Sequence, residues 1–243
     1  MMTRKKGHMH GTDMARKEII TPFGTIAEYA PSPLLSDHAT EFMLRHMEIR
    51  PGAVVAEAGC GSGIMCVFAS KAGASRVYGT DIDDQSLAVA RENAMRNCAE
   101  NISFLHGSLL EPVLDGLDTV IALLPHKPAP RPFNHRYYGG DDGTDLLLEC
   151  IRQSAEKLVR GGSLYLYLNS IANPRRTLAV FGEKFEVGLV AEKKRRFTKE
   201  EFDGLTEGMF AYLEKMRSEG KAEFHKDAGG LFFTAGIYLG KRR

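Results

Sequence analysis

The sequence predicts an α/β fold with a doubly wound parallel sheet, and three observations carry that prediction. A short apolar run at residues 53–56 breaks into alternating glycines, and an apolar helical stretch begins at Ile64. A second run at residues 76–80 leads into an acid, Asp81. From there to residue 168, helical and strand-like patterns alternate. Such alternation is typical of parallel strands joined by helices that cover both faces of a sheet.

Length and composition favour one folded domain with small additions. The chain has 243 residues, of which 43% are hydrophobic and 26% are charged, and its formal net charge is +1. A near-neutral chain shows no overall electrostatic footprint for nucleic acid. No apolar run approaches the length of a membrane span, and no signal peptide is visible. We therefore expect a cytoplasmic protein that binds neither a membrane nor, stably, a nucleic acid.

The cysteines indicate neither a metal site nor a disulfide framework. The four of them are scattered without C-x-x-C spacing, at Cys60, Cys66, Cys98 and Cys150. Reduced thiols in a cytoplasm fit this pattern, and no metal ligand set is expected.

The first 50 residues are expected to form a tail and a cap. Residues 1–17 are basic with little apolar content, so we expect a disordered basic tail. Residues 18–50 form a cap segment and a helix, in which strand-like residues precede Ser32 and Pro33. A serine N-cap followed by proline predicts that this helix begins at residue 33.

The glycine turn after the first apolar run is suited to holding a small ligand. Its glycines are Gly59, Gly61 and Gly63, in the pattern G-x-G-x-G, whereas nicotinamide dinucleotide sites use G-x-G-x-x-G. Glycines permit positive φ and a close approach of ligand to backbone, and the following helix directs free N–H groups at the turn. Asp81 follows Gly61 by 20 residues and could accept hydrogen bonds from ribose hydroxyls.

The remaining elements follow in the order that a doubly wound sheet requires. We expect helices at residues 84–97 and 144–158, and strands at 102–105, 118–123, 163–168, 185–191 and 231–239. The last two strands are normally joined by a short loop, yet about forty residues separate them here. We therefore predict a helical insertion at 198–226, in which one amphipathic helix begins at the capping box of Thr198 and Glu201 and ends at Gly220.

Residues 57–63 and 77–83 together resemble the class I S-adenosylmethionine (SAM) dependent methyltransferases. The nearest group is that of the release-factor-glutamine and ribosomal-protein methyltransferases, which share a small methyltransferase domain. The resemblance implies a seven-stranded Rossmann-like sheet in a SAM-binding domain at residues 51–243. It implies that the turn carries the methionine part of SAM, that Glu57 lies near the amino group, that Asp81 holds the ribose and that Ile82 covers the adenine. The implied cofactor contacts are Tyr29, Glu57, Gly59, Cys60, Gly61, Gly63, Asp81, Ile82, Ser108, Leu109 and Leu123.

The acceptor side departs from the resembling families. They carry Asn/Asp-Pro-Pro-Tyr after the fourth strand, whereas this chain has Leu123-Leu124-Pro125-His126. Ser108 also stands where an acid usually accepts from the adenine amino group. We predict that His126 is the catalytic residue, because an imidazole there could pack on the acceptor and take a proton near neutral pH. Tyr29, Tyr137 and Tyr138 are expected as walls of the acceptor site, and packing alone is the alternative for His126.

The predicted function is SAM-dependent methyl transfer to a nitrogen or oxygen acceptor. Our order of preference for the acceptor is a small molecule, then a protein side chain, then a nucleic acid. A SAM enzyme that transfers another group and a SAM-binding module without chemistry are the alternatives. The basic run at residues 193–196 could draw an anionic acceptor or be a solvated strand end. The insertion could be a lid or an interface, and the oligomeric state is open.

Overall fold

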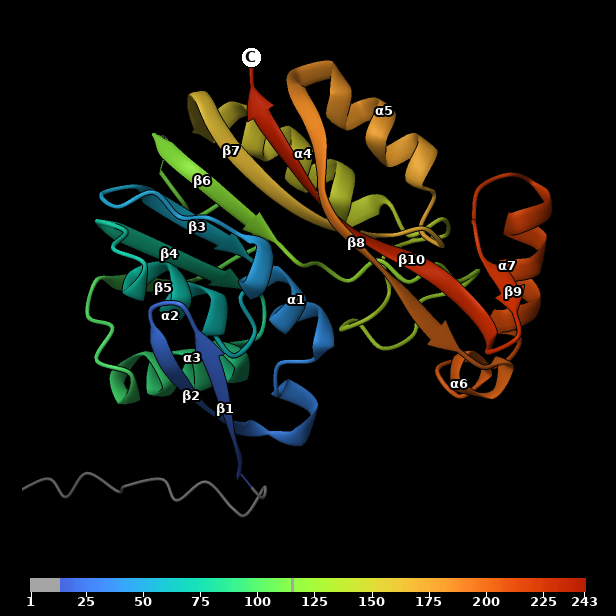
Figure 1. Ribbon diagram of the computed structural model, residues 1–243, viewed down its shortest axis with the longest axis horizontal. Coiled ribbons are helices and arrows are strands. Elements are labelled where there is room, and N and C mark those ends of the chain that lie inside the picture. Colours follow the sequence, from blue (N-terminus) through green and yellow to red (C-terminus); the bar gives the residue numbers. More distant parts are fainter. Residues whose placement is uncertain (1–13, 115) are drawn as a thin grey trace, which may run out of the picture.

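A single sheet forms the centre of the computed structural model, which describes residues 14–114 and 116–243. The strands hydrogen-bond in the order β5-β4-β3-β6-β7-β10-β8 (Figure 1). Their bounds are β3 (Val54–Ala58), β4 (Arg76–Asp81), β5 (Ile102–His106), β6 (Leu117–Ala122), β7 (Leu158–Asn169), β8 (Phe185–Phe197) and β10 (Gly230–Arg242). The strands β3 to β7 are parallel, and β10 is antiparallel to both its neighbours. The predicted α/β sheet is thus confirmed.

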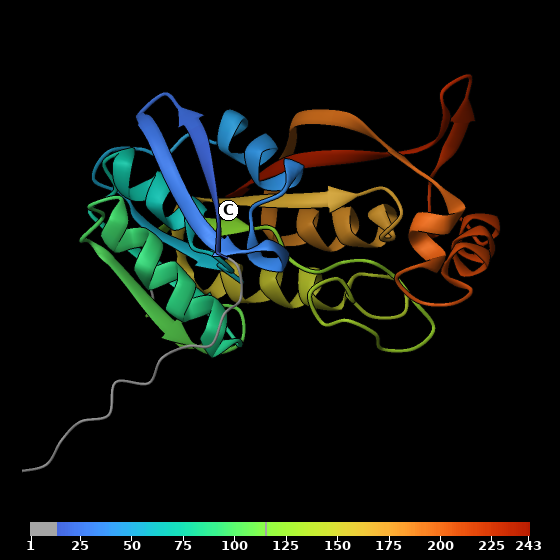
Figure 2. The ribbon, with the colours of Figure 1, turned by 90° about the horizontal axis from the view of Figure 1, so that it is seen from below.

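Helices cover both faces of this sheet because alternate strand residues point to opposite sides. In β7, Tyr165 and Tyr167 belong to one hydrophobic cluster, and Leu164 and Leu166 belong to the other. The first cluster joins this face of the sheet to buried residues of α1 (His38–His46), α2 (Ile64–Lys71) and α3 (Asp84–Arg96). The second cluster packs against α4 (Asp145–Lys157) and α5 (Pro174–Lys184), and Figure 2 shows α1 and α4 on opposite sides of the strands. No helix within the described ranges is both long and apolar enough to span a membrane.

An antiparallel hairpin precedes the sheet and packs on α3. Its strands are β1 (Met14–Thr21) and β2 (Gly24–Pro31). The side chain of Asn97 bonds both the N–H and the carbonyl of Ala27, at 2.9 and 2.7 Å, which fixes β2 to α3. The predicted tail is therefore wrong for residues 14–17, because they pair with β2 along their whole length. The rest of that tail, residues 1–13, lies outside the described residues.

The cap helix begins later than its sequence predicts. Residues Ser32–Leu34 form one short 3-10 turn, η1, and α1 starts at His38. Asp37 is its N-cap, because the carboxylate accepts hydrogen bonds from the backbone N–H groups of Ala39 and Thr40. The shift leaves the segment between η1 and α1 free to line the cavity described below.

The last two long strands extend beyond the others as an arm, visible in both ribbon views (Figures 1 and 2). Each of β8 and β10 has 13 residues, and the insertion between them lies at their far end. The predicted single helix is wrong, since the insertion breaks into α6 (Lys199–Asp203) and α7 (Met209–Ser218), followed by β9 (His225–Asp227). Gly208 adopts φ 76° at the break, a conformation that ends any continuous helix. The rings of Phe197, Phe202 and Phe233 pack together and hold α6 to the arm.

Candidate active site

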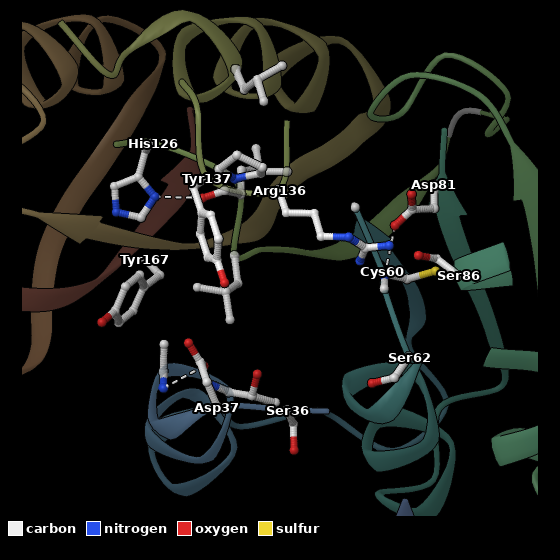
Figure 3. A pocket seen from close by; sticks show the side chains of 18 of the residues that line it. Ser36, Asp37, Cys60, Ser62, Asp81, Ser86, His126, Arg136, Tyr137 and Tyr167 are labelled. Carbon is white, nitrogen blue, oxygen red and sulfur yellow. Dashed lines mark hydrogen bonds between the residues drawn. The ribbon is translucent and has the colours of Figure 1, made fainter. Parts of the chain in front are cut away.

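A cavity of about 440 Å³ lies at the carboxyl ends of the parallel strands (Figure 3). It spans the point between β3 and β6 where the strand order reverses, which is where open α/β sheets bind ligands. Its volume is in the range of small-molecule sites. One half is lined by the glycine turn and the end of β4, and the other by the segments that follow β6 and β7, together with α6.

The glycine turn has the backbone that its sequence predicts. Gly59 and Gly61 have φ values of 70° and 51°, and both line the cavity. A Cβ at Gly61 would meet no atom within 4 Å, so the backbone there is open to a ligand. Cys60 also lines the cavity, and its backbone N–H donates to the carbonyl of Thr80 at 2.7 Å. The turn is therefore tied to β4 while its inner surface remains bare.

Gly63 has a packing role rather than the predicted contact with a ligand. It is not among the lining residues, and a Cβ there would lie 2.8 Å from the Cβ of Ala90. This glycine, with φ 75°, lets α2 approach α3 closely. The neighbouring Ser62 lines the cavity instead.

Asp81 is held in place by backbone N–H groups on both sides. Its Oδ2 accepts from Gly61 at 2.9 Å, and its Oδ1 accepts from Asp83 at 3.0 Å. Ile82, 60% exposed, extends this side of the cavity. The carboxylate thus joins the turn after β3 to the turn after β4, with its remaining lone pairs available to a ligand.

The segment after β5 completes the same half. Ser108 and Leu109 both line the cavity, and Leu109 has φ 50°, which is unusual for a bulky residue. The hydroxyl of Thr80 donates to the carbonyl of Leu109, and Gln153 accepts from the N–H of Leu110 at 2.7 Å. These bonds hold a strained backbone at the edge of the site, as is common where a ligand binds.

Glu57 is a buried carboxyl group beneath the turn. It is 2% exposed, and the thiol of Cys66 donates to its Oε2 at 2.9 Å. Burial raises the pKa of Glu57 to about 8. The side chain is therefore mostly protonated at neutral pH in the free protein.

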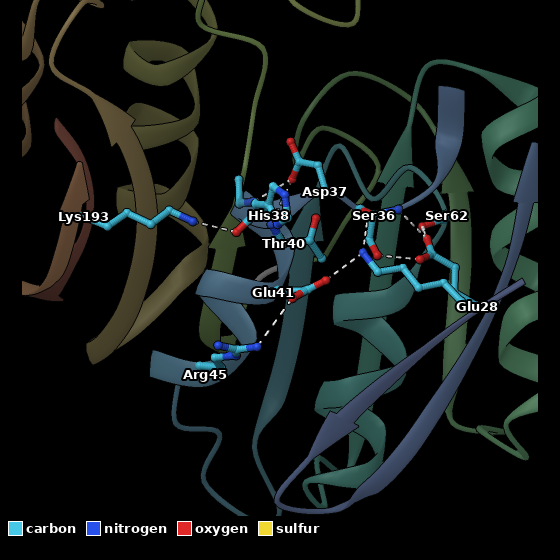
Figure 4. Close-up of polar contacts among 11 residues, drawn as sticks. Glu28, Ser36, Asp37, His38, Thr40, Glu41, Arg45, Ser62 and Lys193 are labelled. Carbon is cyan, nitrogen blue, oxygen red and sulfur yellow. Dashed lines mark hydrogen bonds and ion pairs between the residues drawn. The ribbon is translucent and has the colours of Figure 1, made fainter. Parts of the chain in front are cut away.

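A second buried carboxyl group, that of Glu28, fastens the cap to the glycine turn (Figure 4). The Oε1 of Glu28 accepts from the Ser36 backbone N–H at 2.8 Å and from the Ser62 hydroxyl at 2.6 Å. Ser36 lines the cavity beside Asp37. The cap segment thus closes one side of the site. Tyr29, which follows Glu28 in the sequence, does not contribute to the cavity wall.

Tyr29 lies away from the cavity, contrary to the predicted cofactor contact. The guanidinium of Arg96 lies 4.4 Å from the centroid of its ring, and the residue is not among those that line the site. Its backbone N–H donates to Asn93 at 2.7 Å, which places β2 so that the tyrosine packs on α3.

His126 lines the cavity, but its geometry contradicts a role as general base. The ring is 5% exposed, and both nitrogens are engaged. Nδ1 donates to the carbonyl of Leu124 at 2.6 Å, and Nε2 accepts from the backbone N–H of Asn169 at 3.2 Å. Burial lowers the pKa of His126 to about 4, so the imidazole is neutral and a weak proton acceptor. The residue anchors the loop after β6 to the end of β7.

Of the two loop tyrosines expected as acceptor walls, Tyr137 lines the cavity and Tyr138 does not. Tyr138 is not among the lining residues; its ring packs on Phe133 and its hydroxyl donates to Asp141 at 3.5 Å. The preceding residue, Tyr137, lines the cavity. The ammonium of Lys127 lies 4.7 Å from the centroid of the Tyr137 ring, and burial lowers the pKa of this lysine. Residues 135–137 form a turn closed by hydrogen bonds from the N–H groups of Tyr137 and Tyr138 to the carbonyl of Asn134, and this turn decides which tyrosine faces the cavity.

Arg136 joins the loop after β6 to the opposite wall. Its side chain reaches across the cavity in Figure 3 towards Asp81 and Cys60. The guanidinium pairs with Asp83 at 2.8 Å, and both side chains are partly exposed, at 28% and 24%. The pair makes a roof over the half of the cavity that contains the glycine turn.

The arm supplies the far wall through Arg195, Glu201 and Phe202. Arg195 pairs with Glu201, and Arg196 pairs with Asp227 at 2.7 Å. Lys193 donates to the backbone carbonyl of His38 at 2.7 Å (Figure 4). The basic run therefore makes contacts within the arm and with α1, and the insertion contributes Glu201 and Phe202 to the cavity.

Several lining residues were missed by sequence reasoning. They are Ser36, Asp37, Ser62, Ser86, Lys127, Arg136, Tyr167 and Asn169. One had a usable signal, since Asn169 is a polar residue at the end of a buried strand. Leu123 lines the cavity as predicted from the resemblance.

Comparison with known proteins points to one group of enzymes. Residues 37–124 match the family described as ribosomal protein L11 methyltransferase (PrmA). The chain is 41% identical over 85 residues to a ribosomal protein L11 methyltransferase of Caldanaerobacter subterraneus subsp. tengcongensis, which covers 34% of this chain and 28% of that protein. It is 29% identical over 130 residues to a Methanocaldococcus jannaschii protein provisionally named a protein N5-glutamine methyltransferase, covering 51% of this chain and 66% of the other. The chain thus spans less than two thirds of the length of these relatives.

Solved structures show the same fold at low sequence identity. The YcgJ protein of Bacillus subtilis matches with a TM-score of 0.59 and 13% identity, over 85% of this chain and 98% of that chain. The T. thermophilus 16S rRNA N2 G1207 methyltransferase, in complex with AdoMet and guanosine, matches with a TM-score of 0.61 and 14% identity, over 98% of this chain and 53% of that chain. The chain therefore has the fold of the class I SAM-dependent methyltransferases, and its residues 37–124 carry the sequence pattern of the ribosomal protein L11 methyltransferase family.

Proposed function

We propose that this chain binds SAM against the glycine turn and Asp81 and transfers its methyl group to an acceptor in the other half of the cavity. The observation that carries the proposal is the single cavity that joins the turn, the Asp81 carboxylate and the segments after β6 and β7. The residues fit the cofactor, because the turn presents bare backbone at Gly61 and the carboxylate of Asp81 has free lone pairs.

The cofactor contacts follow from this placement. Gly59, Cys60 and Gly61 would contact the methionine part, Asp81 the ribose, and Ile82 the adenine together with Ser108 and Leu109. Glu57 would lie beneath the amino group. Tyr29 and Gly63 do not belong to this set, because neither lines the cavity.

The acceptor that we propose is a nitrogen of a protein side chain. The sequence alone placed a small molecule first, but the relatives are named for ribosomal protein L11 and protein glutamine, so their names favour a protein. The arm agrees with this, because α6 forms a wall of the cavity at the outer end of a long hairpin. A protein segment could lie along that hairpin while one side chain enters the cavity.

The chemistry asks little of the protein beyond alignment. SAM supplies a methyl group that is already activated by its sulfonium. The residues have to direct the acceptor lone pair along the S–CH₃ bond and exclude water. Tyr137 and Phe202 provide apolar walls for this purpose, and the Arg136–Asp83 pair covers the site.

Asp81→Ala tests the cofactor site. We expect SAM affinity to fall by about 1.5–3 kcal/mol, the usual loss for hydrogen bonds to a charged group. Asp84→Ala is the matched control, since Asp84 is exposed, lies three positions further along and is not among the lining residues. Isothermal titration calorimetry with SAM measures both variants. Equal affinity in Asp81→Ala and the wild type would refute the proposed placement.

A further inference from the structure

Asn169 has an unused hydrogen-bonding group at the cavity. Among the described residues, its Oδ1 is the single buried side-chain nitrogen or oxygen that no other protein group meets in a hydrogen bond. The residue is 8% exposed and lines the cavity. Leaving a buried acceptor unpaired is costly, and a ligand group that donates to it would offset that cost.

The backbone of Asn169 is fixed on all sides. Its N–H donates to His126, and its carbonyl accepts from Ala172 at 3.0 Å. As the last residue of β7, it also pairs with Ala235 of β10. The terminal amide can still turn about its Cβ–Cγ bond, because sp³–sp² torsions are soft. The side chain is therefore a polar group with a fixed base and an adjustable end.

Asn169 lies beside the segment that follows β6. In the resembling families that segment carries a polar Asn or Asp, which this chain lacks. The strands β6 and β7 are parallel, with Ala122 paired to Leu166. The segment that follows β6 therefore lies beside the end of β7. The hydrogen bond between His126 and Asn169 shows that the two segments remain adjacent up to these residues. At position 123, where the resembling families have Asn or Asp, Leu123 offers no hydrogen bond.

We propose that the side-chain amide of Asn169 binds the methyl-accepting nitrogen, with Oδ1 accepting one of its N–H groups. The inference rests on the proposed function and names the residue that orients its acceptor. The resembling families place a polar side chain after the strand that corresponds to β6. In this chain, Asn169 at the end of β7 supplies it. A nitrogen held by one N–H has its lone pair fixed in direction, which is the alignment that transfer to an activated methyl requires.

The reaction balances with Asn169 as a binding group. The nitrogen lone pair forms the new N–C bond while the C–S bond breaks, and its electron pair stays on sulfur. The methylated nitrogen then carries one proton too many, which passes to solvent. An amide oxygen is too weak a base to hold that proton, and both nitrogens of His126 are engaged with the backbone.

The test compares Asn169→Leu, Asn169→Asp and the wild type. Asn97→Leu is a structural control, because Asn97 is also 8% exposed but its side chain bonds the backbone of Ala27. Three quantities are measured on the full chain: SAM affinity by calorimetry, the melting temperature, and transfer of label from methyl-labelled SAM to the protein fraction of a cell extract.

We expect Asn169→Leu to bind SAM like the wild type and to melt at the same or a higher temperature, since an unpaired acceptor is removed. Its transfer should fall by about 10²-fold. Asn169→Asp keeps an oxygen acceptor in place and should recover part of that loss. Asn97→Leu should melt at a lower temperature.

Three results would overturn the inference. They are wild-type transfer by Asn169→Leu, a drop in its melting temperature like that of Asn97→Leu, or transfer by Asn169→Asp no greater than by Asn169→Leu. If the wild type fails to bind SAM, the proposed function falls as well. If the wild type binds SAM and transfers label, any of the three results refutes only the role of Asn169 and leaves the proposed function standing.

Discussion

Two titratable side chains at the cavity have their charge set by burial. His126 is neutral because its ring is enclosed and bonded to backbone on both sides, and Glu57 is protonated because its carboxyl group is enclosed beneath the turn. Both residue types could be read from the sequence as charged or catalytic groups. Their protonation states depend on which helices, strands and loops bury them. This burial cannot be predicted from the residue types alone.

His126 should make the protein acid-sensitive without serving as a base. Its pKa is about 4 in the folded protein against 6.5 for an exposed histidine. The unfolded chain therefore binds the proton first, and stability should fall as the pH drops from about 6.5 to 4, by about 3 kcal/mol. Urea unfolding at several pH values measures this for the wild type and for His126→Asn, in which that part of the pH dependence should be absent.

His46→Asn is the control for this series, because His46 is an exposed residue on α1. Its stability should follow the pH like that of the wild type. An unchanged acid loss in His126→Asn would contradict the assigned protonation state.

Glu57 should release a proton when SAM binds. Its pKa is about 8 in the free protein, and a cationic ligand above the turn favours the ionised form. At pH 7, binding should therefore release up to one proton from this residue. Calorimetry in phosphate and in Tris, which differ in ionisation enthalpy, measures the release as a difference in binding enthalpy. Glu57→Gln should abolish that difference; if the wild type shows the same enthalpy in both buffers, no proton leaves.

At the scale of elements, the loop after β6 is the cover of the site. Its base is anchored by His126, and its far part is joined to the start of α3 by the Arg136–Asp83 pair. Nothing in the local sequence indicates that pair, since the two residues are 53 positions apart. Loops that close over a ligand commonly control its release.

Arg136→Ala should speed the escape of SAM. A partly exposed ion pair contributes up to about 1 kcal/mol, so the dissociation rate should rise by up to about fivefold. Stopped-flow displacement measures the rate, and added salt should reduce the difference from the wild type. Arg131→Ala, in the same loop at an exposed position, should release SAM at the wild-type rate. Equal rates in Arg136→Ala and the wild type would show that the pair does not retain the ligand.

At the scale of the whole molecule, the sequence predicts those features that depend on local pattern. The strand at residues 53–56, the glycine turn and Asp81 are each recognisable within a few residues, and they stand where the sheet requires them. The start of α1 differs from the sequence prediction, because Ser32 and Pro33 form a local cap signal but Asp37 is the residue that caps the helix. The insertion was read as one helix because its apolar period continues through Gly204 and Gly208.

The acceptor half of the cavity was less predictable, because it is assembled from distant segments. Lys127, Asn169 and Phe202 come from a loop, a strand end and the insertion, and only the folded sheet brings them to one cavity. The resemblance identified the cofactor half, where one short motif supplies most contacts. It could not identify the acceptor half, where this chain departs from the motif at Leu123 and His126.

The central claim is that SAM donates its methyl group in this cavity. The most direct measurement incubates the protein with a fractionated cell extract and SAM labelled separately in the methyl group and in the adenosyl group. We expect methyl label to enter the protein fraction while adenosyl label accumulates as S-adenosylhomocysteine, and Asp81→Ala to lose both at SAM concentrations that suffice for the wild type. Adenosyl label in the acceptor, or wild-type protein that binds SAM and labels no fraction, would contradict the account.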